Sequence, residues 1–382
     1  MGRRINVVFV FVGMLRYKGR MLKQIGTLRQ AGHEVTVLHG RTDDEQPDDS
    51  TYDFEIIDRP LRRHPNKVCN YLNHLRWNLR AAGELVRLAP DAIVCEELYG
   101  ALSGALARRR LEDTRFIFDC NELFMHMGMR PLKKLMWRPV HAMVFRAADV
   151  ILHAERNRME FCRDHYRSRA HHELIENLPR PSRAVPERSR KTTAPLDVVY
   201  IGALQPERCC EEVIDAFAEV DPAEARCDFV GFGPEDYQRM LRERIAARGL
   251  DHVRILPPVT HAEMYERLAE YDAGLAFYRN ENLNQYYCAP NKIYDYFLCG
   301  LPAITNDFPG LLQVVEDQRV GVCLPSITGD AMRTALERVR EESLAENITP
   351  EFKKRYSWSA QEGRYLGIFE AEMDMPIIGG SE

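Results

Sequence analysis

The chain has 382 residues, 45% hydrophobic and 29% charged, with a formal net charge of −5. This length is too great for one ordinary core and fits two domains. No apolar run reaches the ~18 residues of a membrane span, and the apolar start 5–12 is too short and lacks a cleavage signature. The ten cysteines show no Cys-x-x-Cys spacing, so we expect thiols in the core of a reduced cytosolic protein, not zinc ligands or disulfides.

Charge is unevenly spread along the chain. Residues 1–180 contain 30 Lys and Arg against 23 Asp and Glu, a net +7, and the remainder contains 22 against 34, a net −12. A basic N-terminal half favours an anionic partner there, either a phosphate compound or a membrane surface. Ordinary solubility charge explains the same imbalance equally well.

The first half alternates strands and helices. Residues 5–12 are β-branched and aromatic, typical of a buried parallel strand. A helix over 21–31 and a strand over 33–38 complete a βαβ unit. The loop after the first strand carries Gly13, Arg16 and Arg20 but no Gly-x-Gly-x-x-Gly, which argues against a dinucleotide dehydrogenase. Further strands are expected at 53–58, 91–95, 116–120, 149–153 and 173–177, with helices at 67–88, 99–110, from about 131 and from 155.

Polar side chains follow two of these strands. Glu96 and Glu97 come after the strand 91–95, and Asn121 and Glu122 come after the strand 116–120, which contains Asp119. Ligands of open α/β sheets bind at the carboxyl ends of the strands, so these are candidate cleft residues.

The stretch 125–147 is rich in methionine and basic residues. Its start, which includes Lys133, Lys134, Trp137 and Arg138, has the composition of a helix on a membrane surface. A helix that packs within the domain, with its charged ends reaching solvent, explains the same composition.

A second α/β domain follows a linker. Pro179, Pro181, Pro186 and the run 187–193 predict the linker. Strands are expected at 196–201, 253–256, 272–277 and 320–324; a further strand ends near 232, and another begins at 303. We therefore divide the chain into a first domain 1–178, a linker 179–195, a second domain 196–352 and a C-terminal helix 353–375 that crosses back to the first domain.

Residues 288–306 combine helix signals with polar chemistry. Pro290 suits the first helical position, and Gly300 suits the left-handed end of a helix. The free N–H groups of Asn291 and Lys292 suit a diphosphate, and Asp295 one turn on suits two ribose hydroxyls. A capped surface helix with a weak Lys–Asp pair is the alternative.

This stretch resembles the donor-site segment of glycosyltransferase family four, in which Pro-x-Lys-x-(Tyr/Phe)-Glu-Tyr is followed by Gly-x-Pro. The runs Leu-Arg-Gln-Ala-Gly-His-Glu-Val-Thr-Val-Leu at 28–38, Phe-Asp-Cys-Asn-Glu-Leu-Phe at 118–124 and Val-Gly-Phe-Gly-Pro at 230–234 also resemble that family. The resemblance covers nearly the whole chain and is most specific at 196–306. It implies the GT-B fold, an α/β architecture of two Rossmann-like doubly wound domains that face each other across a cleft.

The resemblance also implies roles for individual residues. It places the donor among Gly202, Gly231, Gly233, Val259, Tyr287, Pro290, Asn291, Lys292 and Asp295, with Arg208 as the basic residue for the diphosphate. A surface arginine in a first helical turn is the alternative for Arg208. The chain departs from the family pattern at Tyr287, where a glutamate is common, and at Asn121, where a histidine is common. Asn121 either hydrogen-bonds a sugar hydroxyl or caps the next element.

The function implied is sugar transfer from a nucleotide-diphosphate sugar to a lipid-linked or other glycan acceptor, with retention, without metal and without a cofactor. Arg208, Lys292 and Asn121 are the expected catalytic residues. Gly13, Arg16, Arg20, Glu96, Glu97 and Glu122 are the expected acceptor-side residues. We expect a cytoplasmic protein on the inner face of the membrane, with no nucleic-acid partner. A nucleotide-sugar epimerase and a non-catalytic partner subunit on the same fold are the alternatives.

Overall fold

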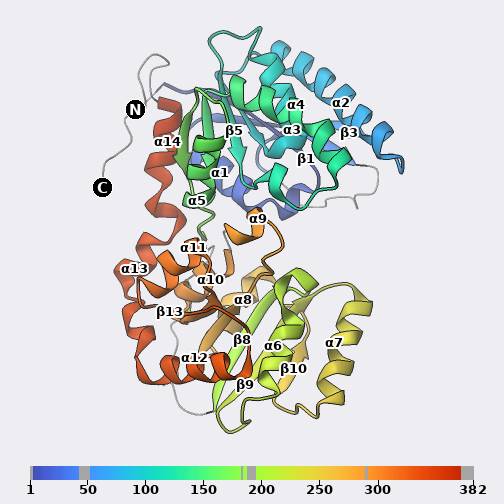
Figure 1. Cartoon of the computed structure of the whole chain (residues 1–382). Coiled ribbons are helices and arrows are strands. Elements are labelled where there is room, and N and C mark those ends of the chain that lie inside the picture. The colour runs from blue at the N-terminus through green and yellow to red at the C-terminus, as the bar shows by residue number, and fades with distance from the viewer. Residues whose placement is uncertain (1–2, 43–51, 182–183, 187–194, 289–290, 371–382) are drawn as a thin grey trace. The chain divides into compact units, whose positions relative to one another are not determined.

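The computed structural model describes residues 3–42, 52–181, 184–186, 195–288 and 291–370 (Figure 1). The chain forms two compact units, each with its own sheet. The first unit comprises Met1–Asn177 and Gln361–Glu382, and the second comprises Leu178–Ala360. No helix among the described residues is both long and apolar enough to cross a membrane.

The first unit contains seven parallel strands. These are β1 (Asn6–Val12), β2 (Glu34–Thr42), β3 (Glu55–Leu61), β4 (Ala92–Glu96), β5 (Arg115–Cys120), β6 (Val150–His153) and β7 (His171–Leu174). Their order in the sheet is β3-β2-β1-β4-β5-β6-β7. β1 lies inside the sheet, between β2 and β4. Because a strand of this kind is covered on both faces, its side chains are buried from Val7 to Phe11, which explains its apolar run. The prediction of a Rossmann-like first domain is confirmed, although β7 begins two residues before the predicted strand 173–177.

The helices of the first unit are α1 (Gly19–Gln30), α2 (Lys67–Leu88), α3 (Glu97–Ala107), α4 (Pro131–Ala147), α5 (Arg156–His165) and α14 (Glu362–Glu370), with short 3-10 turns η1 (Leu15–Tyr17) and η2 (Phe124–His126). α3 lies between α2 and α4 (Figure 1). An aromatic cluster joins these three helices, because the Trp137 ring contacts the rings of Tyr71, His74 and Tyr99.

The second unit contains six parallel strands in the order β10-β9-β8-β11-β12-β13. They are β8 (Leu196–Ala203), β9 (Ala225–Phe232), β10 (Val253–Leu256), β11 (Ala273–Ala276), β12 (Ala303–Asn306) and β13 (Gly321–Leu324). Its helices are η3 (Pro206–Arg208), α6 (Cys210–Phe217), α7 (Glu235–Ala247), α8 (His261–Leu268), α9 (Leu283–Tyr286), α10 (Asn291–Leu298), α11 (Pro309–Leu311), η4 (Leu312–Glu316), α12 (Gly329–Glu341), η5 (Leu344–Asn347), α13 (Pro350–Arg355) and η6 (Trp358–Ala360).

α10 forms where the helix signals predict it. Ile293 and Phe297 are buried, one helical turn apart, as the spacing of apolar residues requires. Gly300 has a φ of +76°, and the Leu301 N–H donates to the Tyr296 carbonyl at 3.0 Å. This left-handed glycine ends the helix as predicted. Pro290 lies outside the described residues.

The C-terminal segment is interrupted. Within 353–370 the structure contains the end of α13, the turn η6 and α14, and residues 371–375 lie outside the described part. α14 belongs to the first unit, where Thr27 Oγ1 donates to Glu362 Oε1 at 3.0 Å. In the predicted linker, 182–183 and 187–194 also lie outside the described residues.

Candidate functional site

The side chain of Lys292 lies at the start of α10, is half-buried and has two aromatic rings beside its ammonium group. Its Nζ is 3.8 Å from the ring centroid of Tyr200, on β8, and 5.9 Å from that of Tyr278. Burial lowers the pKa of Lys292 well below its usual value, and the positive charge of Arg208 lowers it further. No carboxylate of the described residues forms an ion pair with this ammonium group. Lys292 is therefore a sheltered cation, not the exposed partner of a surface pair.

Arg208 reaches the same aromatic ring from η3. Its guanidinium carbon lies 4.4 Å from the ring centroid of Tyr278. Arg208 and Lys292, far apart in sequence, thus lie against one ring and repel each other, as the lowered pKa of Lys292 reflects. Two neighbouring cations of this kind favour an anion between or beside them.

The backbone next to this cation pair carries no side chain, because it belongs to Gly202. Gly202 has a φ of +128°, and a Cβ built on it would lie 3.5 Å from Lys292 Nζ. A side chain there would be strained and would contact the ammonium group, so glycine leaves this backbone open to a ligand.

Gly231 and Gly233 have a different reason to be glycine. A Cβ on Gly231 would lie 1.8 Å from the carbonyl oxygen of Gly202, and a Cβ on Gly233 would lie 2.1 Å from that of Leu204. Both distances are too short for non-bonded atoms, so no side chain fits at either position. These two glycines therefore allow the carboxyl ends of β8 and β9 and the residues just after them to approach closely, and they support the position of Gly202.

The remaining predicted donor residues lie on α10, directly after α9 and shortly after β10. Asp295 is half-buried and accepts a hydrogen bond from the Tyr265 hydroxyl at 3.0 Å. Asn291, the first residue of α10, is exposed. Val259 is half-buried against the apolar cluster that contains Ile293 and Tyr265. Tyr287 follows α9, and its ring contacts that of Tyr286.

In the first unit, a cavity of about 370 Å³ brings together two of the predicted acceptor-side residues and one of the predicted catalytic residues. Glu97, Asn121 and Glu122 line it, with Lys133 and an apolar wall. The wall consists of Leu98, Tyr99, Phe118, Cys120, Phe124, Met127 and Met129. Carboxylates and an amide beside aromatic and apolar surface suit a sugar that carries an apolar portion.

Asn121 caps no helix. The residue at the N-terminal cap of η2 is Leu123, and the Asn121 side chain makes no hydrogen bond to any described residue. Only its backbone carbonyl is engaged, accepting from Arg158 Nη1 at 2.6 Å. The capping alternative is therefore wrong, and the amide remains available to a ligand. Glu122 pairs with the same Arg158 at 3.4 Å.

Two carboxylates stand at the carboxyl end of β4. Glu97 has a left-handed φ of +61°, uncommon for a residue other than glycine, and pairs with Lys18. Glu96 is buried, and its Oε2 has no hydrogen-bond partner among the described residues. Burial raises the pKa of Glu96 to about 8; Lys18 opposes this shift and Asp119 adds to it. Burial alone would lower the pKa of Lys18, but the Glu97 and Glu96 carboxylates outweigh it and raise that pKa.

The surroundings differ among the three residues predicted in the loop after β1, of which Arg20 lies in α1 and Arg16 in η1. Arg20 is buried, bonds Asp119 through Nε at 2.9 Å and also donates to the Ile175 carbonyl, so its donors are used to hold the fold. The prediction that Arg20 faces an acceptor has no support in this arrangement. Gly13 has a φ of +125° and accepts from His39 Nε2 at 2.6 Å, and the Arg16 guanidinium lies over the Tyr17 ring at 5.0 Å.

Several residues of these sites were missed by the sequence analysis. Tyr200, Tyr278 and Tyr265 hold the cations and Asp295, and Lys18 pairs with Glu97. Lys133 donates to the Tyr99 hydroxyl at 3.0 Å. The tyrosines stand at or near the ends of predicted strands or in a helix, which is the available signal, but nothing in the local sequence says which ring meets which cation.

Comparisons with known proteins agree with this arrangement. Residues 19–177 match the family described as "Glycosyl transferase 4-like domain", and residues 195–342 match "Glycosyl transferases group 1". Alpha-D-kanosaminyltransferase of Streptomyces kanamyceticus is 28% identical over 178 residues. That match spans 45% of this chain and 45% of the relative, which is less than half of its length.

Two solved structures share the fold over almost their full length. Sucrose-phosphate synthase of Thermosynechococcus elongatus has a TM-score of 0.74 at 15% identity, covering 96% of this chain and 98% of its own. Anabaena HepE in complex with UDP and glucose has a TM-score of 0.72 at 14% identity, covering 97% and 100%.

Two Rossmann-like parallel sheets that match these structures define a protein of the GT-B class. Within that class, the chain belongs to the group 1 glycosyl transferases, glycosyltransferase family four, whose members are retaining enzymes that use nucleotide-sugars.

Proposed function

We propose that this chain moves a sugar from a nucleotide-diphosphate sugar, bound by the second unit, to a glycan acceptor bound by the first. Transfer proceeds with retention and with no metal at the diphosphate. The observation that carries the proposal is the pair Arg208 and Lys292, held against Tyr278 beside the open backbone of Gly202.

The cation pair suits the leaving diphosphate. Negative charge grows on the diphosphate as the bond to the sugar breaks, and fixed cations in a sheltered site stabilise that charge strongly. The forked donors of Arg208 and the ammonium group of Lys292 supply two positive charges, and the N–H groups of Asn291 and Lys292 at the start of α10 add a partial one. This combination replaces a divalent ion.

Asp295 suits the ribose of the donor. Tyr265 donates to Oδ1 of Asp295 at 3.0 Å, which fixes the carboxylate in one orientation. The carboxylate's remaining acceptor capacity suits ribose hydroxyls. Val259 and Tyr287 contribute contacts to the base and the sugar, and Gly231 and Gly233 act through their support of Gly202.

The first unit suits the acceptor. The cavity lined by Glu97, Asn121 and Glu122 offers acceptors for sugar hydroxyls, and its apolar wall suits an attached lipid. Asn121 hydrogen-bonds the transferred sugar but exchanges no proton near neutral pH, so its role is positioning.

The first unit also suits adsorption to the inner face of the cell membrane, where a lipid-linked acceptor resides. Leu132 and Leu135 on α4 are 55% and 67% exposed, beside exposed Lys133, Lys134 and Arg138. Basic residues near an anionic surface contribute about 1 kcal/mol each. Trp137, expected to help this helix adsorb to the membrane surface, is instead 4% exposed and belongs to the core, so α4 adsorbs through its leucines and charges.

A thermal-shift screen tests donor binding. The full chain is mixed with sugar conjugates of UDP, GDP and ADP, and with the free diphosphates. We expect one nucleotide class to raise the melting temperature of the wild type but not of a variant with Arg208→Ala and Lys292→Ala. A shift of equal size in wild type and variant would contradict the assigned site.

A further inference from the structure

Three buried side chains of the first unit converge on one point beside the proposed acceptor cavity, whose wall includes Cys120. Cys120 ends β5, His153 ends β6 and Cys162 lies on α5, and Cys120 pairs with His153 in the sheet. One ligand atom of each residue lies within 4.8 Å of the others. Among the residues that the structure describes, these three form the one such group that could hold a metal ion.

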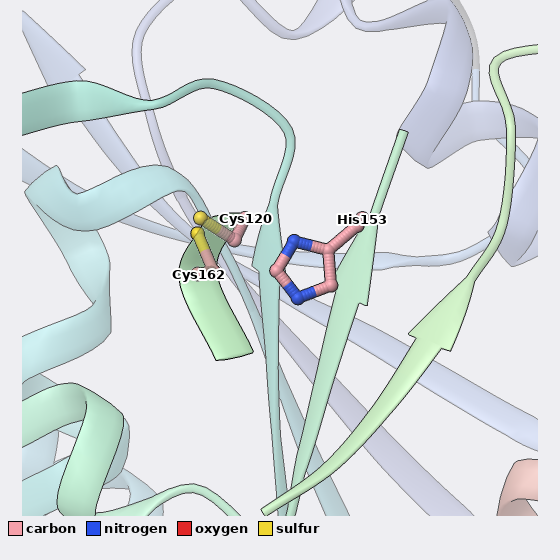
Figure 2. Close-up of side chains that lie close together, drawn as sticks. All are labelled: Cys120, His153 and Cys162. Atoms are coloured by element: carbon pink, nitrogen blue, oxygen red, sulfur yellow. The ribbon is translucent and has the colours of Figure 1, made fainter. Parts of the chain in front are cut away.

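The histidine has a nitrogen without a partner. His153 is fully buried, and its Nε2 lies 2.9 Å from His172 Nδ1. Its Nδ1 has no hydrogen-bond partner among the described residues. Figure 2 shows the nitrogen next to the ring's attachment carbon, Nδ1, turned toward the two sulfur atoms. A buried polar atom without a partner costs free energy unless something binds it.

We propose that Cys120, His153 and Cys162 bind one Zn²⁺ through the two sulfurs and Nδ1. Two thiolates and an imidazole are ligands that zinc prefers. If Nε2 carries the proton and donates it to His172 Nδ1, the Nδ1 lone pair is free to bind. This is the usual arrangement around zinc, where the second nitrogen of the ligating histidine is oriented by a neighbour.

The charge balance suits the interior of the protein. Binding replaces the two thiol protons, which pass to solvent, and the resulting Zn²⁺ with two thiolates carries no net charge. A neutral centre avoids the cost of a buried charge, and it adds no positive charge near Arg20 and Arg158, whose fields reach His153. The carbonyl oxygen of Glu122, 3.5 Å from Cys120 Sγ, is a candidate fourth ligand.

The ion would position the acceptor-side residues through the backbone next to Cys120, without contacting the acceptor itself. Cys120 directly precedes Asn121, whose carbonyl accepts from Arg158 on the same helix as Cys162. Zinc would tie β5, β6 and α5 together at this point. Its role is structural, in the first unit, and is separate from the neutralisation of the diphosphate in the second.

Metal content and cobalt spectra test the site. The full chain is purified without chelator from zinc-supplemented medium, and its metal content is measured by elemental analysis. The metal-free chain is then titrated with Co²⁺, which gives a thiolate-to-cobalt absorption band only when cysteine sulfur binds it. Cys120→Ser and Cys162→Ser remove one ligand each. Cys95→Ser changes a buried cysteine of the neighbouring strand β4 and serves as the matched control.

We expect one zinc per chain and a cobalt–thiolate band in the wild type and in Cys95→Ser. We expect loss of bound zinc in the two site variants and a higher melting temperature for zinc-loaded than for metal-free wild type. A wild type without zinc and without the cobalt band would overturn the proposal. So would formation of a Cys120–Cys162 disulfide with no metal uptake. If a site variant fails to fold, the wild-type spectrum alone decides. Nucleotide binding by the second unit is measured in parallel, so failure of one proposal does not imply failure of the other.

Discussion

Replacement of Lys292 by methionine removes the charge but keeps an unbranched side chain of similar length. A lost charge-assisted contact to a diphosphate costs roughly 1.5–3 kcal/mol. At about 1.4 kcal/mol for each factor of ten, the dissociation constant of the donor rises about 10- to 150-fold. Isothermal titration calorimetry with the preferred nucleoside diphosphate measures the change. Lys354→Met, an exposed lysine of α13, is the control and keeps wild-type affinity.

The surroundings of Lys292 also determine the stability that we expect for the Lys292→Met variant. The substitution removes the contact between the ammonium group and the Tyr200 ring. However, the lowered pKa of Lys292 means that its surroundings as a whole disfavour the charged form. At neutral pH the variant is therefore at least as stable as the wild type in urea unfolding. This advantage shrinks as the pH rises toward the unfolded-state pKa of lysine, because the wild-type side chain then becomes neutral too.

Donor binding also depends on pH through Lys292. A bound diphosphate favours the charged ammonium group, so affinity falls as the pH rises through the pKa of Lys292, and Lys292→Met removes this dependence. Wild-type affinity in Lys292→Met, or clear destabilisation of the variant, would refute the reasoning that a sheltered, unneutralised cation awaits the diphosphate.

Three further outcomes are expected. Turnover persists when EDTA is added at the start of an assay, because the protein's own cations neutralise the diphosphate; loss of turnover that Mg²⁺ or Mn²⁺ restores would contradict this. Glu96 has a folded-state pKa raised to about 8, so its contribution to stability is full below the unfolded value near 4.5 and is lost as the pH rises through 8. Between pH 4.5 and 8, the unfolding free energy of the wild type falls by up to about 5 kcal/mol relative to that of Glu96→Gln. The surface control Glu112→Gln should follow the wild type at every pH, and if Glu96→Gln does so too, the effect is absent. In liposome co-sedimentation, the chain binds anionic more than neutral vesicles, and changing Lys133, Lys134 and Arg138 to glutamate abolishes the difference; equal binding to both vesicle types would favour a soluble acceptor.

The strands and the helix ends were predictable because their signals are local. β-branched runs gave both parallel sheets, and the glycine that closes α10 is the one the sequence predicts, since only a residue tolerant of positive φ fits there. The polar residues at the ends of β4 and β5 were also predictable, because parallel strands present their carboxyl ends at one edge.

Contacts between distant segments were not predictable. In α2, the leucines Leu72 and Leu79 are 42% and 60% exposed, whereas His74 and Trp77 are buried. The reason lies outside the helix: Trp77 Nε1 donates to the Arg59 carbonyl at 3.0 Å, and His74 meets Trp137 of α4. A periodicity in one helix carries no information about such partners.

The same limit applies to the two sites. Arg20 looked like a ligand-binding residue in a basic loop, but its partner Asp119 is 99 residues away. Cys120, His153 and Cys162 follow no zinc spacing and meet only because β5, β6 and α5 are neighbours.

Product analysis with the donor identified by the thermal-shift screen shows directly whether the chain transfers the sugar with retention. The full chain is incubated with that nucleotide-sugar, with and without candidate lipid-linked acceptors, and the products are followed by NMR. We expect release of nucleoside diphosphate together with a glycoside of retained anomeric configuration, and loss of both in the Arg208→Ala, Lys292→Ala variant. Conversion of the donor to its epimer without acceptor, or tight donor binding without transfer to any acceptor, would contradict this expectation.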